Sequence, residues 1–101
     1  MLIYNTTYSV SNDALQNFYI WLHEVFIPEV EREQMLTNPR LLKVLDAQNK
    51  ENVSLSLQWE VSGSATLHRW YMKQGVQMDE QIAKMFGEKV VTFPTILEVL
   101  K

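Results

Sequence analysis

The chain has 101 residues, enough for one domain over residues 1–101, and it lacks cysteine, so disulfides, thiolate metal sites and thiol catalysis are excluded. Nine basic and twelve acidic residues give a net charge of −3 without a basic run, which argues against nucleic acid as a partner. Because no apolar run has the length of a membrane span and no basic, apolar leader opens the sequence, we expect a soluble cytoplasmic protein.

The first segment, residues 2–10, alternates with a period of two residues and predicts a β-strand. Its better core face is made by Leu2, Tyr4, Thr6, Tyr8 and Val10. Ser11 and Asn12 offer side-chain oxygens to free backbone N–H groups, and Asp13 places a negative charge at the positive end of a helix dipole. We therefore expect a capped helix directly after the strand.

This helix has an apolar stripe at helical spacing. Within about 80° of Leu22, at 100° per residue, the stripe contains Leu15, Phe18, Val25, Phe26 and Val30. Pro28 lies inside the pattern, and its ring disturbs the preceding turn, so we expect the helix to bend or restart near Phe26. Ile20 and Ile27 are expected on the outer side, where they form a candidate apolar patch for a partner.

Two extended segments follow a break at Thr37-Asn38-Pro39, because the residue before a proline is pushed out of the α region. We expect a strand over residues 40–46 and a hairpin loop over residues 47–52. In the next strand, polar residues alternate with Val53, Leu55, Leu57, Trp59 and Val61. This alternation requires one dry face and one polar face.

Ser62-Gly63-Ser64 is expected to cap a second helix, whose apolar stripe is centred on Tyr71. Within about 60° of that centre the stripe contains Leu67, Gly75, Met78, Ile82, Met85 and Phe86. Gly87 suits the left-handed position that ends a helix. Residues 89–93 then form the last strand before Pro94, which a sheet accepts mainly at an edge.

The order of these elements is β-α-β-β-α-β. Two such half-units close as one four-stranded antiparallel sheet with both helices on one face. The sequence therefore predicts a ferredoxin-like α+β sandwich whose other sheet face is left open.

Four segments of the chain carry a family resemblance. They are Tyr4-Asn5-Thr6-Thr7, Thr37-Asn38-Pro39-Arg40, Ser56-Leu57-Gln58-Trp59-Glu60-Val61 and Phe86-Gly87-Glu88-Lys89-Val90. Together they resemble a small bacterial family, domain of unknown function 4286, over essentially the whole chain. This family is similar to the dimeric α/β-barrel group, in which two ferredoxin-like protomers pack their open sheet faces together. The resemblance implies the fold and a homodimer, and it implies no particular activity.

Asn5, Trp59 and His68 are the candidate catalytic residues. Their distribution over the first strand, the third strand and the second helix resembles the Asn, Trp and His of haem-degrading monooxygenases on the same barrel. A working triad needs all three side chains in one cleft, whereas the alternation directs Trp59 toward the helices and Asn5 to the opposite face. His68, about 60° from the core centre, is expected to be a flanking histidine satisfied by backbone or water.

The polar face of the sheet is the better functional lead. Its candidate ligand-binding residues are Asn5, Ser56, Gln58 and Glu60. They line either a solvated surface or a hydrogen-bonding cavity between two protomers, where a desolvated Glu60 would be a candidate base. RNA recognition is excluded, because the outward side of the third strand lacks aromatic and basic residues.

No motif in the sequence fixes a reaction. We expect a non-catalytic homodimer that binds a small ligand or a partner through the open sheet face. The alternative is an oxygenase-like enzyme, either cofactor-free or haem-dependent. Neither histidine has a second ligand at metal-binding spacing, so we expect no metal site and no cofactor.

Overall fold

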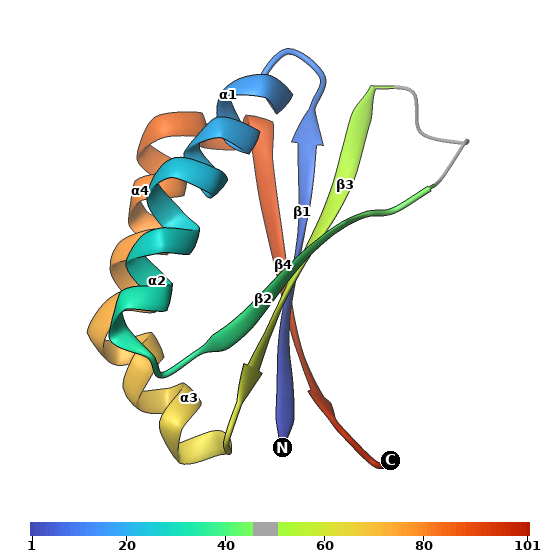
Figure 1. The fold of residues 1–101 in the computed structure, drawn as a ribbon. Coiled ribbons are helices and arrows are strands. Elements are labelled where there is room, and N and C mark those ends of the chain that lie inside the picture. The colour runs from blue at the N-terminus through green and yellow to red at the C-terminus, as the bar shows by residue number, and fades with distance from the viewer. Residues whose placement is uncertain (46–50) are drawn as a thin grey trace.

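The computed structural model describes residues 1–45 and 51–101, and four strands form one sheet in the order β2-β3-β1-β4 (Figure 1). The strands are β1 Leu2–Ser11, β2 Thr37–Lys43, β3 Asn52–Val61 and β4 Val90–Glu98. The first helix consists of α1 Leu15–Trp21, η1 Leu22–Phe26 and α2 Ile27–Glu33. The second helix consists of α3 Ser64–Trp70, η2 Tyr71–Gly75 and α4 Val76–Phe86, and the short turn η3 Gly87–Lys89 leads into β4.

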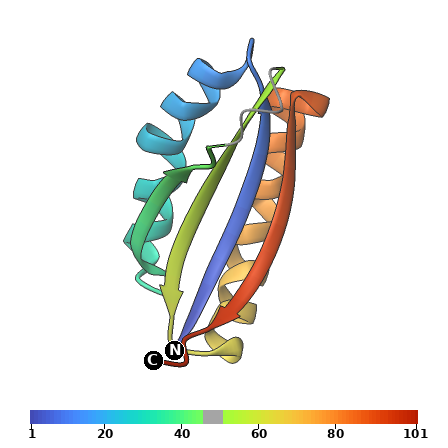
Figure 2. The same ribbon diagram turned by 90° about the vertical axis from the view of Figure 1, so that its right-hand side faces the viewer.

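Both helices lie on one face of the sheet, and in the described part of the chain no helix covers the other face (Figure 2). All three strand pairings are antiparallel. In the central strand, Thr7 lies opposite Ser56 of β3 on one side and opposite Phe93 of β4 on the other. The chain thus has the predicted ferredoxin-like α+β sandwich, with one covered and one open sheet face.

The core lies between the helices and the inner face of the sheet. The alternation predicted for the central strands is confirmed, since Tyr8 and Val10 of β1 and Leu57 and Trp59 of β3 are buried. Phe18 of the first helix is also fully buried, and its ring meets that of Tyr8 edge-on with the centroids 5.0 Å apart. Such aromatic pairs add to the stabilisation that burial provides.

The first helix contains the irregularity that Pro28 predicts. η1 is a π-helical turn, in which the N–H of Ile27 donates to the carbonyl of Leu22. Pro28 follows in the first turn of α2, so the predicted restart near Phe26 is confirmed. The outward placement of Ile27 is wrong, because the wider turn brings Ile27 above Leu22, where it packs partly against the core. Ile20 alone is exposed, and the predicted two-isoleucine patch does not form.

The second helix has a matching π-helical turn, η2, in which the N–H of Val76 donates to the carbonyl of Tyr71. The extra residue in this turn shifts the apolar stripe, so Trp70 is buried, and Tyr71, the predicted centre of the stripe, is exposed. Met85 is also exposed, because it lies at the flank of the shifted stripe. The predicted positions that are buried or partly buried are Leu67, Gly75, Met78, Ile82 and Phe86.

Neither predicted side-chain cap forms. α1 has Ala14 at its cap position. The Ser11 hydroxyl donates to the carboxylate of Asp13, and its oxygen accepts no hydrogen bond from a helix N–H. Asp13 also pairs with Lys89 of η3, with 2.9 Å between Nζ and Oδ2. At α3 the cap position is occupied by Gly63, without a side-chain hydrogen bond. Local pairing on the surface therefore replaces the expected capping.

The strand β2 begins earlier than the sequence predicts. It spans Thr37–Lys43 instead of residues 40–46, because pairing with β3 continues across a bulge in which Asn38 has a positive φ of 51°. The predicted loop over residues 47–52 lies mostly outside the described residues, and its last residue, Asn52, belongs to β3.

The strand β4 is longer than predicted. It continues beyond the expected residues 89–93, through Pro94, to Glu98. Pro94 is tolerated because β4 is an edge strand, as expected. The strand has only one neighbour, so the N–H that proline lacks removes no hydrogen bond to a second strand. Gly87 ends the second helix as predicted, with a positive φ of 58°, but its ψ of −131° lies outside the expected left-handed helical conformation.

Candidate functional site

The open face of the sheet carries the residues selected from the sequence as ligand-binding candidates. Directly paired residues of antiparallel strands share a face. The registers therefore place a continuous polar strip along the two central strands, made of Asn5, Thr7 and Ser9 of β1 and Ser54, Ser56, Gln58 and Glu60 of β3. Asn5, Ser56, Gln58 and Glu60 are thus brought together, as expected.

Part of this polar strip is already hydrogen-bonded within the chain. The Ser56 hydroxyl donates to Asn5 Oδ1, and Asn5 Nδ2 donates to Thr7 Oγ1 at 3.3 Å. Glu60 accepts a hydrogen bond from Asn38 Nδ2 at 3.1 Å. Among the described residues, Gln58 has no side-chain partner, so its amide has its full capacity for a partner outside the chain.

Apolar side chains lie on both sides of the polar strip. On β2, Leu42 lies opposite Ser56, and on β4 the corresponding positions are Val91, Phe93 and Leu97. All four side chains are exposed, and Phe93 has 54% of its surface accessible. We call these residues the apolar rims. The open face is therefore polar along its middle and mainly apolar along its two edges, where Arg40 of β2 and Thr95 of β4 are polar exceptions.

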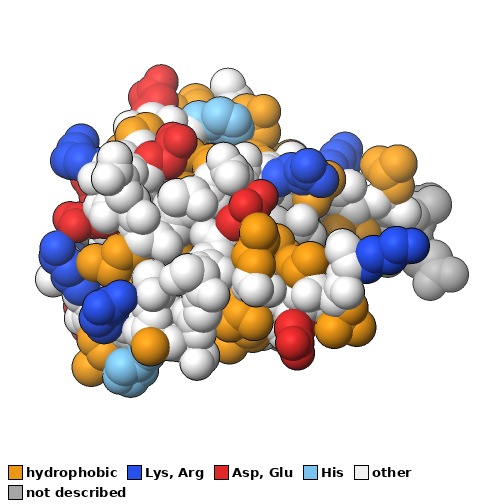
Figure 3. All heavy atoms as spheres, turned by 60° about the horizontal axis from the view of Figure 1, so that its bottom comes forward, with side chains coloured by type: hydrophobic (Ala, Val, Ile, Leu, Met, Phe, Trp, Pro, Cys, Tyr) orange, Lys and Arg blue, Asp and Glu red, His pale blue; other side chains and the backbone are white. Residues whose placement is uncertain are grey.

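The apolar character of the β4 edge continues to the C-terminal residues. Val99 and Leu100 are exposed, as is Met1, whose carbonyl accepts a hydrogen bond from the N–H of Val99 at 3.1 Å. In the view from the end of the sheet that holds both termini, hydrophobic side chains lie between charged ones (Figure 3). This end of the molecule extends the rim along β4.

A shallow hollow of about 520 Å³ opens where β2 bulges away from β3. Its lining includes Arg40, Gln58 and Glu60. In the described part of the chain, Arg40 has no ion-pair partner. The hollow therefore offers a free guanidinium, an amide and a carboxylate to a polar group.

The structure does not bring Asn5, Trp59 and His68 together. Asn5 lies on the open face, whereas Trp59 is 2% exposed in the core on the opposite side of the sheet. His68 is exposed on α3, at the edge of a different pocket. The sheet itself separates Asn5 from the other two side chains, so they form no common cleft.

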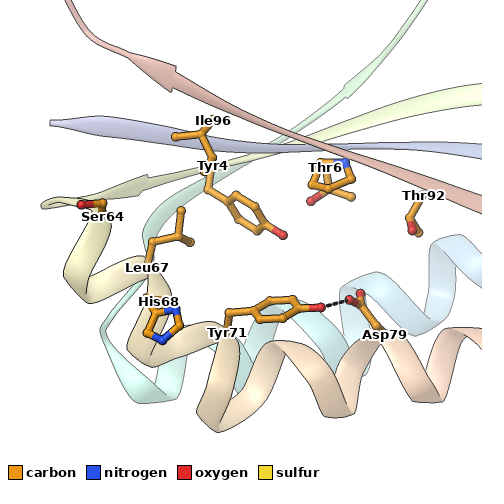
Figure 4. Close-up of a pocket in the computed structure, with 10 residues that line it drawn as sticks. Tyr4, Thr6, Ser64, Leu67, His68, Tyr71, Asp79, Thr92 and Ile96 are labelled. Atoms are coloured by element: carbon orange, nitrogen blue, oxygen red, sulfur yellow. Dashed lines mark hydrogen bonds between the residues drawn. The ribbon is translucent and has the colours of Figure 1, made fainter.

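That second pocket, the helix-side pocket, lies between the second helix and the inner face of the β1 and β4 strands (Figure 4). Its volume is about 480 Å³. It is lined by Tyr4, Thr6, Ser64, Leu67, His68, Tyr71, Asp79, Thr92, Pro94 and Ile96. A mostly apolar hollow with a few convergent polar groups is the usual form of a small-molecule site.

Asp79 lies within one group of polar side chains in this pocket, and the polar Ser64 and His68 lie at the opposite end. The Tyr71 hydroxyl donates to Asp79 Oδ2 at 3.1 Å. Burial raises the pKa of Asp79 above its ordinary value, and the hydrogen bond from Tyr71 offsets only part of this effect. Burial also raises the pKa of Tyr4, so its phenol keeps its proton at neutral pH. Asp79 is an exposed residue, so its carboxylate lies at the solvent edge of an apolar hollow.

Most of this pocket is not predictable from the sequence. The uniform helical period assigns Tyr71 to the core and indicates no role for Asp79. The π-turn η2 followed by an α-turn spans about eight residues, so it places Tyr71 and Asp79 on one side of the helix. In a helix of uniform period the two residues are about 80° apart, which hides the pair.

Two further features are absent from the described residues. No group of three or more His, Asp or Glu side chains is arranged to hold a metal ion. No helix in the described ranges has the length and apolarity needed to cross a membrane.

Solved structures with the same fold include three that match nearly the whole chain. An ethyl tert-butyl ether D (EthD) family protein from Bacillus halodurans is 12% identical with a TM-score of 0.73, covering 99% of this chain and 100% of its own. A candidate antibiotic biosynthesis monooxygenase from Deinococcus radiodurans is 16% identical with a TM-score of 0.71, covering 100% and 94%. A dimeric ferredoxin-like protein from an uncultured marine organism is 14% identical with a TM-score of 0.73, covering 100% and 96%.

These identities are low, so the three structures support the fold alone. No curated protein sequence matches the chain. The sequence does match a family over residues 1–100, and that family is described as a domain of unknown function, DUF4286. The expected resemblance is therefore confirmed, and the chain belongs to the DUF4286 family.

Proposed function

We propose that this chain is a non-catalytic binding protein that acts as a homodimer, with the open sheet faces of two copies packed together. The observation that carries the proposal is the pair of apolar rims around the polar strip. A sheet face that only meets water places polar side chains on its edge strands as well. Here Leu42, Val91, Phe93 and Leu97 are apolar and exposed instead.

The dimer accounts for both parts of this face. Packing two open faces together removes the rims from water, and a stable interface of this kind buries roughly 800 Å² per protomer. The dimeric ferredoxin-like neighbour supports this arrangement, since it shares the fold over 96% of its own chain. The polar strip then lines the space between the two sheets.

Within that space, Asn5, Ser56, Gln58 and Glu60 are the proposed ligand-binding residues. Gln58 contributes free donors and acceptors, while Asn5 and Ser56 are held in place by their mutual hydrogen bond. The ligand is a small polar molecule that is recognised by hydrogen bonds, and its binding requires no cofactor.

The oxygenase-like alternative has less support. It would gather Asn5, Trp59 and His68 in one cleft, and the sheet separates them. The names of two structural neighbours favour it. Their sequence identity to this chain is low, however, and supports only a common fold.

A pair of charge substitutions tests the dimer. Phe93→Asp places a carboxylate in the rim, whereas Met85→Asp changes an equally exposed residue on the second helix, with 55% against 54% of the side chain accessible. Light scattering at tens of micromolar should give a dimer mass for the wild type and for Met85→Asp, and a monomer mass for Phe93→Asp. A monomeric wild type, or dissociation by both variants alike, would refute the proposal.

Native mass spectrometry of the purified dimer tests the inter-sheet ligand. The proposal predicts a retained mass that is lost on Gln58→Ala while the dimer persists. A dimer without any retained mass, under conditions that preserve non-covalent complexes, would leave the homodimer intact and refute the ligand.

A further inference from the structure

The helix-side pocket has a polar end and an apolar end. In Figure 4 the hydroxyl groups of Tyr4 and Tyr71 both point toward the end of the pocket that holds Asp79 and Thr92. The opposite end is walled by the aliphatic side chains of Leu67 and Ile96, with Ser64 and His68 beyond them. A ligand that matches this lining has an apolar body and one polar head.

The charge at the polar end indicates what that head must be. Asp79 Oδ2 accepts the hydrogen bond from Tyr71, and Oδ1 has no partner within the described ranges. No Lys or Arg of those ranges lies at ion-pair distance from Asp79, since the two ion pairs are Lys73–Glu33 and Lys89–Asp13. A carboxylate beside an apolar hollow is stabilised by a cation with hydrogen-bond donors.

The other groups at this end are compatible with such a cation. Tyr4, Thr6 and Thr92 present hydroxyl oxygens that accept hydrogen bonds. Tyr4 on β1 and Tyr71 on the second helix lie on opposite sides of the pocket, and both hydroxyl groups point toward its Asp79 end. His68, the remaining titratable side chain of the lining, lies near the apolar end, away from Asp79.

We propose that the helix-side pocket binds a small organic amine, with its ammonium group at Asp79 and its apolar body between the second helix and the β1 and β4 strands. This site lies on the covered side of the sheet. It therefore remains accessible when the open faces of two copies pack together, and it does not depend on the homodimer.

Tryptamine and tryptophol are the matched probes, because they share an indole body and differ in an ammonium or a hydroxyl head. Titration of the ¹⁵N- and methyl-labelled full chain by NMR should show saturable shifts at Tyr71, Asp79 and Ile96 with tryptamine. Tryptophol should bind at least about tenfold more weakly, because its neutral hydroxyl can donate to the Asp79 carboxylate but forms no ion pair with it. Equal affinity for the two probes, or no saturable shift with tryptamine, would overturn the proposal.

Two acidic-to-amide variants on the second helix sharpen the test. Asp79→Asn should weaken tryptamine binding by about tenfold or more and abolish the preference over tryptophol. Glu80→Gln removes the same formal charge from the neighbouring residue, which does not line the pocket, so tryptamine affinity should change less than about twofold. Equal effects of the two variants would show that tryptamine responds to net charge, and the site would be refuted.

Neither variant should unfold the chain. Because the pKa of Asp79 is raised, its ionised form is less stable in the folded than in the unfolded state, and Asp79→Asn removes that cost at neutral pH. Thermal unfolding should therefore give an Asp79→Asn stability no lower than that of Glu80→Gln. Loss of binding without loss of folding separates this site from a structural role of Asp79.

Discussion

The two faces of the same sheet differ in where their apolar side chains lie and in whether those side chains are buried. On the covered face, apolar residues such as Leu57 are buried under the helices, whereas the open face carries Ser56 and its polar neighbours in the middle and Phe93 at the edge. The covered face is explained by the chain's own core. The edges of the open face are not, because exposed apolar side chains there stabilise nothing within one copy. This contrast is the reason for placing the proposed interface on the edge strands of the open face, beside the central strands that define the fold.

The largest expected effect distinguishes neighbouring residues on opposite faces. Leu57→Ala removes a side chain that is 1% exposed and should cost about 2–5 kcal/mol of unfolding free energy. Ser56→Ala removes one hydrogen bond, to Asn5, and should cost about 0.5–1.5 kcal/mol. Urea titration of both variants measures the difference. If the two losses were equal, the assignment of the faces would be wrong.

A loss of stability of intermediate size is expected from a substitution at Gly75 in the second helix. A Cβ atom there would lie 2.6 Å from Tyr71 Cδ1 and 2.8 Å from Trp70 Cζ3, both of which belong to rings packed at the π-turn. Gly75→Ala should therefore destabilise the chain by about 1–3 kcal/mol, because the cost of overpacking exceeds the stabilisation from the higher helix propensity of alanine.

Gly63→Ala is the matched control for that change. A Cβ atom at Gly63 meets no atom within 4 Å, and the backbone there is extended. Its expected cost is at most about 1 kcal/mol, from a poorer cap residue. Thermal unfolding that ranked Gly63→Ala as the more damaging change would mean that the packing at η2 is wrong.

The smallest effect concerns Asp13, which lies outside both faces. The hydrogen bond from Ser11 and then the ammonium of Lys89 hold the pKa of Asp13 below its ordinary 3.8. This contribution to stability is present above the ordinary pKa and is lost as the pH falls through the depressed one. In a carboxyl ¹³C NMR titration, Ser11→Ala and Lys89→Ala should each raise this pKa toward its ordinary value. An unshifted titration in the wild type would contradict the contacts at this turn.

The sequence predicted the covered face well and the helical registers less well. The alternation of Leu57 and Ser56 has a period that does not drift, so the strand faces follow directly from it. The predicted stripes of the helices assume a uniform period, whereas each π-turn inserts an extra residue. A uniform period therefore places Ile27 and Tyr71 on the wrong sides.

The candidate sites were predictable to different degrees. Asn5, Ser56, Gln58 and Glu60 share a face because strand pairing dictates it, and this follows from the sequence. The helix-side pocket depends on side chains from β1, the second helix and β4 that meet only in three dimensions. Its key residue, Asp79, also follows a π-turn that no local feature of the sequence predicts.

The most direct test of the central claim is a mixed-label NMR experiment. An equimolar mixture of ¹³C-methyl-labelled and unlabelled chain is examined for NOEs that pass only between copies. Packing of the two open faces should give such NOEs from the rim methyls of Leu42, Val91 and Leu97, and none from Met72 and Met85, which are exposed on the helical side. Intermolecular NOEs confined to the helical methionines, or no intermolecular NOEs at all, would contradict it.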